Sequence, residues 1–279
     1  MGEIGVLSFS LTGYEFSAVY NVLSLGIASM LFTSIFLFIA RDRVLPKYRM
    51  AVMVSATVTS IAAYHYFRMF DSFNHGYGIN EASGAAAAAG KNMLAFGAAN
   101  YNVGYRYIDW FLTVPLLLVE LVAVLGLAKA VQSSLLKRLV PAAAAMIALG
   151  YPGDAKIDIM GIHPSVWGLL STIPFLYIMY VLWIEMKKSL ESQSARVRSL
   201  FQTLRVLLLA TWGVYPVTFI LAMNTPAGTP STASEVVARE IGYSIADILA
   251  KCLFGLLIFA IARIKSAEES KEHAAAEGH

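Results

Sequence analysis

The sequence predicts an all-α fold, a bundle of seven membrane-spanning helices, and two observations support that prediction. Of the 279 residues, 58% are hydrophobic and only 14% are charged, whereas an ordinary globular domain is about 25% charged. The apolar residues also gather in seven stretches, each near the roughly 20 residues with which a helix crosses the hydrocarbon layer. One bundle therefore accounts for residues 1–279 as a single domain that crosses the plasma membrane several times.

Polar segments connect the stretches and follow the last one. The first connection is basic, and the longest one covers residues 73–100. A polar tail, residues 266–279, follows the seventh stretch. The long connection has an alanine-rich centre with little side chain to pack, so we expect a flexible cap or a small hairpin on the outer surface. We expect the tail to be solvated and frayed. The expected helices are residues 13–40, 48–72, 101–127, 135–153, 163–187, 200–223 and 236–265.

Basic residues are concentrated in the connections after the first, third and fifth stretches. The opposite connections contain only Lys91, Lys156 and Arg239. Because cytoplasmic connections of membrane proteins are enriched in lysine and arginine, we expect the N-terminus outside and the C-terminus in the cytoplasm. The basic connections contain Arg41, Arg43, Lys47, Arg49, Lys129, Lys137, Arg138, Lys187, Lys188, Arg196, Arg198 and Arg205.

Charge and cysteine content exclude several classes of function. The formal net charge of +3 is spread over alternate connections and forms no single basic face, so nucleic-acid binding has no support. Cys252 is the only cysteine, so the chain forms no internal disulfide and no cysteine-based metal site is expected. We therefore look for function in the ionisable residues at membrane depth.

The third stretch has a polar stripe along one side. An ionisable residue at membrane depth costs several kcal/mol unless it is paired or hydrated, so each is a functional candidate. Asp109, Thr113 and Glu120 fall within about 40° of one another on a helix, and Arg106 lies roughly 60° away. Glu120 is eleven residues, or about 16 Å, further toward the cytoplasm than Asp109.

The seventh stretch contains Asp247 and Lys251, four residues apart and therefore on one face near the middle of the bilayer. One interpretation is a buried ion pair that specifies helix packing. The other is an amine kept for covalent chemistry, because a lysine in an apolar site condenses with an aldehyde to form a Schiff base. Asp247 and Asp109 would then be the counterions of the protonated product.

Three segments resemble the microbial rhodopsins, and the resemblance extends over all seven stretches. Within that family the chain is most similar to the branch of proteorhodopsins and xanthorhodopsins. The segments are Arg106-Tyr107-Ile108-Asp109-Trp110-Phe111-Leu112-Thr113-Val114-Pro115, Trp212-Gly213-Val214-Tyr215-Pro216 and Ala246-Asp247-Ile248-Leu249-Ala250-Lys251.

The resemblance implies a light-driven ion transporter, not an enzyme. Lys251 would hold all-trans retinal as a Schiff base, Asp109 would be the main counterion and proton acceptor, and Asp247 the second counterion. Asp109, Thr113 and Glu120 match the proton-pump signature of the family, in which Glu120 would be the cytoplasmic proton donor. With the predicted orientation, protons would move outward.

The resemblance also assigns residues around the retinal. His65 matches the histidine that pairs with the acceptor carboxylate in this branch; from the residues alone, a core histidine capped by a carbonyl is the simpler interpretation. Leu117 matches the position where leucine accompanies green absorption. The remaining pocket residues, which spacing alone would assign to packing, are Trp110, Ser171, Phe175, Trp212, Tyr215 and Pro216.

Gly168 suggests a second pigment. In xanthorhodopsin-like pumps a glycine at the matching position opens a window to lipid in which a hydroxylated or keto carotenoid lies as an antenna; the alternative is a glycine that only permits close helix packing. Membrane lipid and protons are the other expected partners, together with further copies of the chain in a trimer, pentamer or hexamer.

Three other functions stay open. A sensory rhodopsin shares the fold and the pocket, but a sensor has no need of Glu120. A light-gated channel would need a further row of glutamates. A receptor or transporter without retinal would leave Asp247 and Lys251 as a structural pair.

Overall fold

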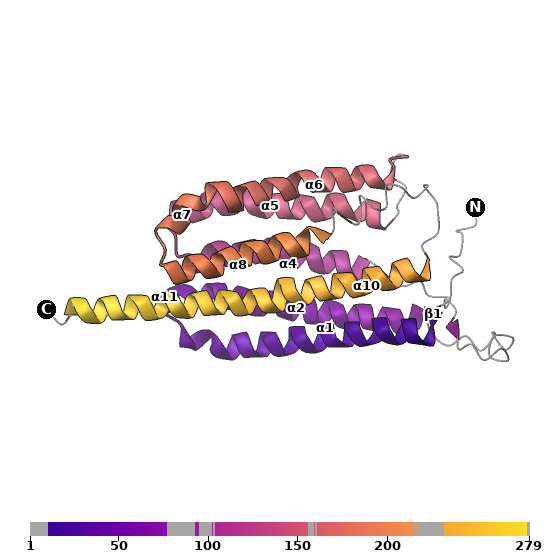
Figure 1. Cartoon of the computed structure of the whole chain (residues 1–279), viewed down its shortest axis with the longest axis horizontal. Helices are drawn as coiled ribbons and strands as arrows, with labels where there is room; N and C mark the ends of the chain where they lie inside the picture. The colour runs from indigo at the N-terminus through magenta and orange to yellow at the C-terminus, as the bar shows by residue number, and fades with distance from the viewer. Residues whose placement is uncertain are drawn as a thin grey trace.

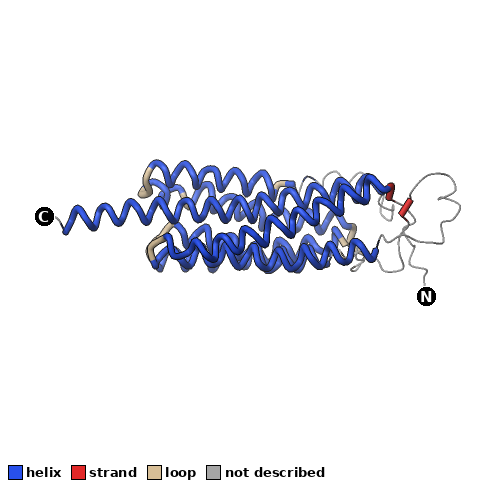
Figure 2. Tube along the Cα trace, turned by 90° about the horizontal axis from the view of Figure 1, so that it is seen from below, coloured by secondary structure: helices blue, strands red, loops and turns tan. Residues whose placement is uncertain are grey.

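In the computed structural model of the chain, long helices run side by side along one axis (Figure 1). The first helix begins at one end of the bundle, and the last helix ends at the other. Figure 2 shows the same arrangement from below, with short loops at the ends of the described helices. The structure describes residues 11–76, 93–94, 102, 104–155, 159, 161–214, 217 and 232–277.

The first helix, α1 (Gly13–Ala40), has the bounds that the sequence predicts. A capping box fixes its start: Thr12 Oγ1 accepts a hydrogen bond from Glu15 N at 3.2 Å, and the Glu15 carboxylate accepts one from Thr12 N at 2.8 Å. Thr12 also belongs to β1 (Leu11–Thr12), which pairs antiparallel with β2 (Met93–Leu94). A strand from the long connection thus covers the start of α1, and most of that connection lies outside the described residues.

The described helices overlap all seven predicted stretches. Six of these helices are long and apolar enough to cross a membrane, when α10, η4 and α11 are counted as one continuous helix. The helix α8 is the seventh segment of the bundle. The elements η3 and η4 are π-helical turns within longer rods. The further elements are η1 (Arg41–Arg43), α2 (Pro46–Gly76), α4 (Gly104–Val124), α5 (Lys129–Asp154), α6 (Pro164–Tyr180), η3 (Val181–Glu185), α7 (Lys187–Glu191), α8 (Ala195–Trp212), α10 (Ala233–Ile248), η4 (Leu249–Leu253) and α11 (Phe254–Glu277).

Arg205, which the sequence analysis counts both in the basic run after the fifth stretch and in the predicted helix 200–223, lies in a helix, α8, where it is 4% exposed. Its Nη1 donates to the Leu182 carbonyl in η3 at 2.9 Å, and its guanidinium lies 5.3 Å from the centre of the Trp183 ring. A tertiary hydrogen bond and a cation–π contact thus hold the residue inside the bundle.

The polar tail is helical, so the prediction of a frayed tail is wrong. The helix α11 continues through Glu277, beyond the predicted end at residue 265. Ser266 Oγ accepts a hydrogen bond from Leu45 N at 2.9 Å, and Glu269 pairs with Lys47 at 2.5 Å. Contacts with Leu45, just before α2, and with Lys47, in the first turn of α2, therefore support the helix beyond residue 265, and the far end of α11 is exposed as predicted.

Polar and apolar residues are distributed as expected for a bundle in lipid. Asp109, Glu120, Asp247 and Lys251 are buried, while many large apolar side chains face outward. A water-soluble protein has the opposite distribution, with apolar side chains inside and charged ones outside. The exposed apolar faces therefore contact membrane lipid, and the chain is a multi-pass membrane protein. On α1 and α6 the outward residues include Phe32, Phe36, Phe38, Ile39, Leu169, Ile173 and Leu176.

Candidate functional site

Lys251 is the centre of the candidate site. It lies in η4, the π-helical turn that joins α10 to α11, and its side chain is almost fully buried. Its Nζ donates to Asp109 Oδ2 at 2.6 Å and to Asp247 Oδ1 at 2.9 Å. The structure thus brings the predicted amine between the two predicted carboxylates, one from α4 and one from α10.

The two carboxylates differ in how many hydrogen bonds they accept. Besides Lys251, Asp247 accepts bonds from Tyr66 Oη at 2.8 Å, Trp110 Nε1 at 3.0 Å and Arg106 Nη1 at 3.3 Å. Asp109 Oδ1, by contrast, is buried without a hydrogen-bond partner among the described residues. Asp247 is saturated, whereas Asp109 has an oxygen available for a proton.

Thr113 is close to Asp109 but does not bind its carboxylate. The Thr113 hydroxyl donates to the Asp109 backbone carbonyl at 2.7 Å. Both residues are fully buried on the same side of α4, as the predicted stripe requires. Thr113 therefore lies one helical turn after Asp109, and its hydroxyl hydrogen is already used in a hydrogen bond to the backbone.

A buried glutamate that sequence reasoning missed extends the site outward. Glu240 is 1% exposed and accepts a hydrogen bond from Arg106 Nη2 at 2.7 Å. Arg239 Nε lies 3.5 Å from the same carboxylate. One signal in the sequence was available, because Glu240 precedes Asp247 by two helical turns and so shares its face.

His65 lies on α2, and the structure places no hydrogen bond between it and Asp109. Its Nδ1 is buried without a hydrogen-bond partner among the described residues, like Asp109 Oδ1. Its ring makes an edge contact with Tyr64, with the centroids 5.1 Å apart. The proposed effect of His65 on Asp109 stays a prediction.

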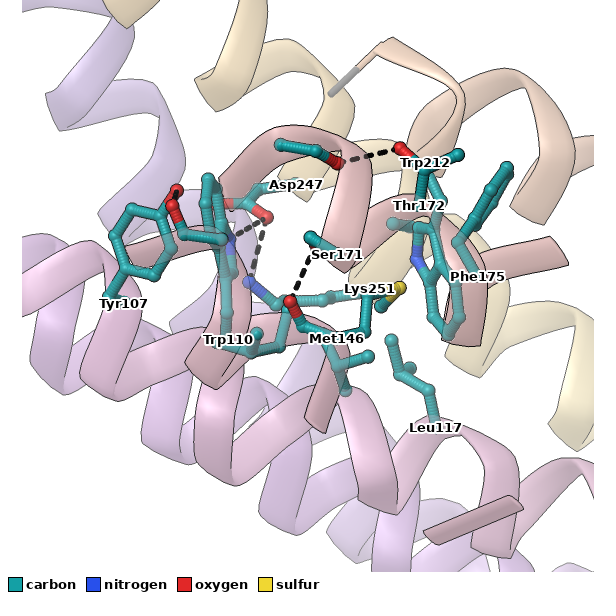
Figure 3. A pocket seen from close by; sticks show the side chains of 15 residues that line it. Tyr107, Trp110, Leu117, Met146, Ser171, Thr172, Phe175, Trp212, Asp247 and Lys251 are labelled. Carbon is teal, nitrogen blue, oxygen red and sulfur yellow. Dashed lines mark hydrogen bonds and ion pairs between the residues drawn. The ribbon is translucent and has the colours of Figure 1, made fainter. Parts of the chain in front are cut away.

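A cavity begins at Lys251 and runs between Trp110 and Trp212, which Figure 3 shows on either side of the lysine. About 650 Å³ of empty space lies between the lining residues, part of it open to the outside. The lining residues are Tyr107, Trp110, Val114, Leu117, Met146, Ile147, Gly150, Gly168, Ser171, Thr172, Phe175, Trp212, Asp247, Ala250 and Lys251.

The lining fits an elongated apolar molecule with one reactive carbonyl end. The amine and its carboxylates stand at one end, and the polar groups along the wall are already used: Ser171 Oγ donates to the Met146 carbonyl at 2.7 Å, and Thr172 Oγ1 donates to the Gly168 carbonyl at 2.8 Å. Retinal, an apolar polyene with an aldehyde, has these properties. Tyr215 and Pro216, also predicted in the pocket, lie outside the described residues.

Gly168 forms part of the cavity wall on α6. Its neighbour Leu169 is exposed on the outer surface of the same helix. With hydrogen as its side chain, Gly168 leaves this wall thinner than any other residue would. Gly168 is thus part of the wall of the candidate retinal pocket, and the opening to lipid at this position stays a prediction.

Glu120 is fully buried eleven residues beyond Asp109 on α4, among apolar residues such as Leu117 and Leu121. Its Oε2 forms a hydrogen bond with the Ser55 hydroxyl, and its Oε1 has no partner among the described residues. Gly255 permits this contact, because a Cβ there would lie 3.3 Å from Ser55 Cβ. Sequence reasoning missed Ser55, and a serine in an apolar helix gave no signal.

Comparison with known proteins shows the family to which the chain belongs. The family model described as bacteriorhodopsin-like protein matches residues 18–265. The solved structure of xanthorhodopsin, described as a light-driven ion pump with dual chromophore, is 41% identical with a TM-score of 0.84, covering 94% of this chain and 99% of that one. Green-light absorbing proteorhodopsin from gamma-proteobacterium EBAC31A08 is 31% identical, covering 84% of this chain and 82% of its own length. Bacteriorhodopsin of Halobacterium salinarum is 30% identical over 79% of this chain and 76% of its own.

Proposed function

The chain belongs to the bacteriorhodopsin-like family of retinal-binding, light-driven pumps, and on that premise we propose that it moves protons outward across the plasma membrane. One observation supports the proposal above all others. Two buried carboxylates stand on opposite sides of Lys251, and one is ion-paired while the other has only a hydroxyl beside it. Such a difference gives two carboxylates opposite roles.

Lys251 is the residue that would hold retinal, through Nζ, in the cavity between Trp110 and Trp212. The bound retinal supplies a light-driven change of shape that redirects the proton on this nitrogen and weakens its hold. Asp109 and Asp247 stabilise the positive charge on Nζ in the dark, because both carboxylates lie within 3 Å of it.

Asp109 takes the proton from Nζ. It is the nearer carboxylate, at 2.6 Å, and its second oxygen has no competing donor among the described residues. A proton on Asp247 would instead compete with hydrogen bonds that it already accepts, from Tyr66 and Arg106 at Oδ2 or from Trp110 at Oδ1. Asp247 therefore remains ionised and Asp109 changes charge.

Glu120 returns a proton to Nζ from the other side. In the dark it holds a proton, because an ionised carboxylate in this apolar layer would have no cation beside it. In the neutral form the Glu120 hydroxyl would donate to Ser55 Oγ, and Ser55 would donate to the Ala51 carbonyl at 3.3 Å, while Glu120 Oε1 has no partner among the described residues. Ser55 thus holds the donor neutral and oriented.

Direction follows from the places of the two carboxylates on α4. With the predicted orientation, Asp109 lies toward the outside and Glu120 toward the cytoplasm. A proton accepted by Asp109 and replaced from Glu120 has moved outward.

The test is the pH of an unbuffered suspension of cells that contain the protein and retinal, illuminated with green light. We expect acidification that a protonophore abolishes. Glu120→Gln should slow the return of a proton to Nζ by about 100-fold or more, since a positioned acid contributes about 10²–10⁴-fold. Glu191→Gln, which neutralises an exposed glutamate on α7, is the matched control and should leave the rate unchanged.

Three outcomes would contradict the proposal. A coloured protein that leaves the pH constant would favour a sensory rhodopsin. Alkalinisation would reverse the assigned direction. No colour after retinal is added would leave Asp247 and Lys251 as a structural pair.

A carotenoid antenna is a second proposal, and Gly168 in the cavity wall supports it. A hydroxylated or keto carotenoid on the outer face of α6 would lie beside the retinal pocket and pass its excitation inward. Its bands should then appear in the excitation spectrum for proton transport. Gly168→Trp should remove those bands, and an excitation spectrum that added carotenoid leaves unchanged in the parent protein would exclude the antenna.

A further inference from the structure

A second buried lysine, Lys265, lies where three segments meet at the cytoplasmic end of the bundle. Its Nζ donates to the Leu125 carbonyl at 3.0 Å and to Gln193 Oε1 at 2.5 Å. The side chain is 9% exposed, and it forms no ion pair within 4 Å in the part of the chain that the structure describes. A buried ammonium is thus satisfied by a backbone carbonyl and an amide.

The end of α4 provides that carbonyl. The helix stops at Val124, and Gly126 then adopts a φ of +61°, a conformation that favours glycine. The Leu125 carbonyl is left outside the helix, where Gln193 Nε2 also donates to it at 3.5 Å. Tyr48 also contacts the cluster, with its ring centre 5.4 Å from Lys265 Nζ.

Lys265 therefore joins elements that are far apart in sequence. Gln193 lies in the connection between α7 and α8, Leu125 follows α4, and Lys265 belongs to α11. Figure 1 shows the α7–α8 connection and α11 at the same end of the bundle. Lys265, together with the direct bond from Gln193 to Leu125, holds that connection against the end of the helix that contains Glu120.

This cluster stands between Glu120 and the cytoplasm. Leu125 is five residues beyond Glu120, or about 7.5 Å along the axis of a helix. The intervening layer includes Leu121, Val124 and Ile258, which are fully buried and apolar. Protons move through water or along hydrogen-bonded groups, so this layer must be wetted before a proton reaches Glu120.

We propose that Lys265 is a latch on the cytoplasmic entrance: its two hydrogen bonds hold the α7–α8 connection closed over Glu120, and their opening sets the rate of proton uptake. The inference rests on the proposed role of Glu120 as donor. Lys265 is a positioning residue here, since it acts through the connection that it holds and does not touch retinal or the transported proton.

The test is a flash experiment on the full-length, retinal-loaded protein in lipid vesicles. The loss and return of the proton on Lys251 are followed by absorption, and uptake from the medium by a pH-indicating dye. In Lys265→Met we expect uptake to be about tenfold faster, since loss of a hydrogen bond to a charged group changes a barrier by roughly that factor. Loss of the proton to Asp109 should keep its rate.

Two further variants make the result specific. Gln193→Leu removes the other side of the latch, so it should accelerate uptake as well, and the double variant should be no faster than the faster single one. Lys47→Met removes the same charge from the same end of the bundle, but Lys47 is 57% exposed and pairs with Glu269, so its uptake rate should match the parent protein.

Uptake that is unchanged or slower in both Lys265→Met and Gln193→Leu would overturn the latch, as would equal acceleration by Lys47→Met. If Lys265→Met fails to assemble, Gln193→Leu decides alone. Parent protein that releases and takes up no protons would instead contradict the proposed function, so the two failures are distinguishable.

Discussion

The two sides of Lys251 differ in how they hold charge. On the outer side, Asp109, Asp247, Arg106 and Glu240 form a continuous set of ion pairs with Lys251, with separations of 2.6–3.3 Å. Each charge in this set has an opposite charge beside it, which offsets the cost of burial.

On the inner side, Glu120 is buried with a hydroxyl as its only hydrogen-bond partner among the described residues. Buried apolar residues lie between Glu120 and the hydrogen bonds of Lys265, the proposed latch. The same chemical group is therefore stable as an anion on one side and as a neutral acid on the other. Under the proposed function, the surroundings of the two carboxyl groups set the direction of transport, because the groups themselves are chemically alike.

Removing the acceptor should give the largest effect. Asp109→Asn leaves Lys251 with one ionised carboxylate and no group that takes its proton, so light-driven acidification should be lost. Breaking a buried pair should also lower the free energy of unfolding by about 3–5 kcal/mol. Loss of colour on heating measures the second effect, and Asp42→Asn, at an exposed surface pair, is the control. Acidification at the parent rate would exclude Asp109 as the acceptor.

Removing the partner of the donor should give a smaller effect. Ser55→Ala takes away the hydroxyl that orients Glu120 and keeps its neutral form hydrogen-bonded. A neutral hydrogen bond contributes about 1 kcal/mol, so the return of a proton to Lys251 should slow by about fivefold to tenfold while its loss keeps its rate. Ser60→Ala, which acts on a hydroxyl of α2 bonded to Ser34, is the matched control. Equal rates in Ser55→Ala and the parent would show that Glu120 does not depend on this hydroxyl.

The fold could be predicted from the sequence because lipid imposes one requirement on every helix. A crossing needs a long apolar run, and the predicted bounds of α1 agree with the structure. Helix ends outside the membrane are set by tertiary contacts instead. The extension of α11 depends on Leu45, 221 residues away from Ser266, and no local pattern contains that pairing.

The same division applies to the site. Asp247 with Lys251, and Asp109 with Thr113, could be found because four residues make one helical turn. Ser55 was missed because its partner lies 65 residues away, and the burial of Arg205 was missed because its partner is a backbone carbonyl in η3. Sequence spacing indicates neighbours on one helix, while neighbours on different helices follow from packing.

The smallest expected effect lies outside both halves of the site, at Glu269 in the extension of α11. Burial alone would raise the pKa of this carboxyl, but hydrogen bonds from Lys47 and Tyr48 outweigh burial and hold the pKa below its ordinary value of 4.5. A carboxyl with a lowered pKa in the folded state contributes stability above its unfolded pKa, and that stability is lost as the pH falls through the folded value.

Lys47→Met should therefore lower the midpoint of thermal unfolding slightly at pH 7, by the equivalent of less than about 1 kcal/mol because solvent screens this pair. The difference between variant and parent should shrink as the pH falls below 4.5 and the parent's Glu269 becomes protonated. A difference that persists unchanged at low pH would mean that Lys47 stabilises α11 through packing over Tyr48, whose ring centre lies 5.1 Å from its Nζ, and not through Glu269.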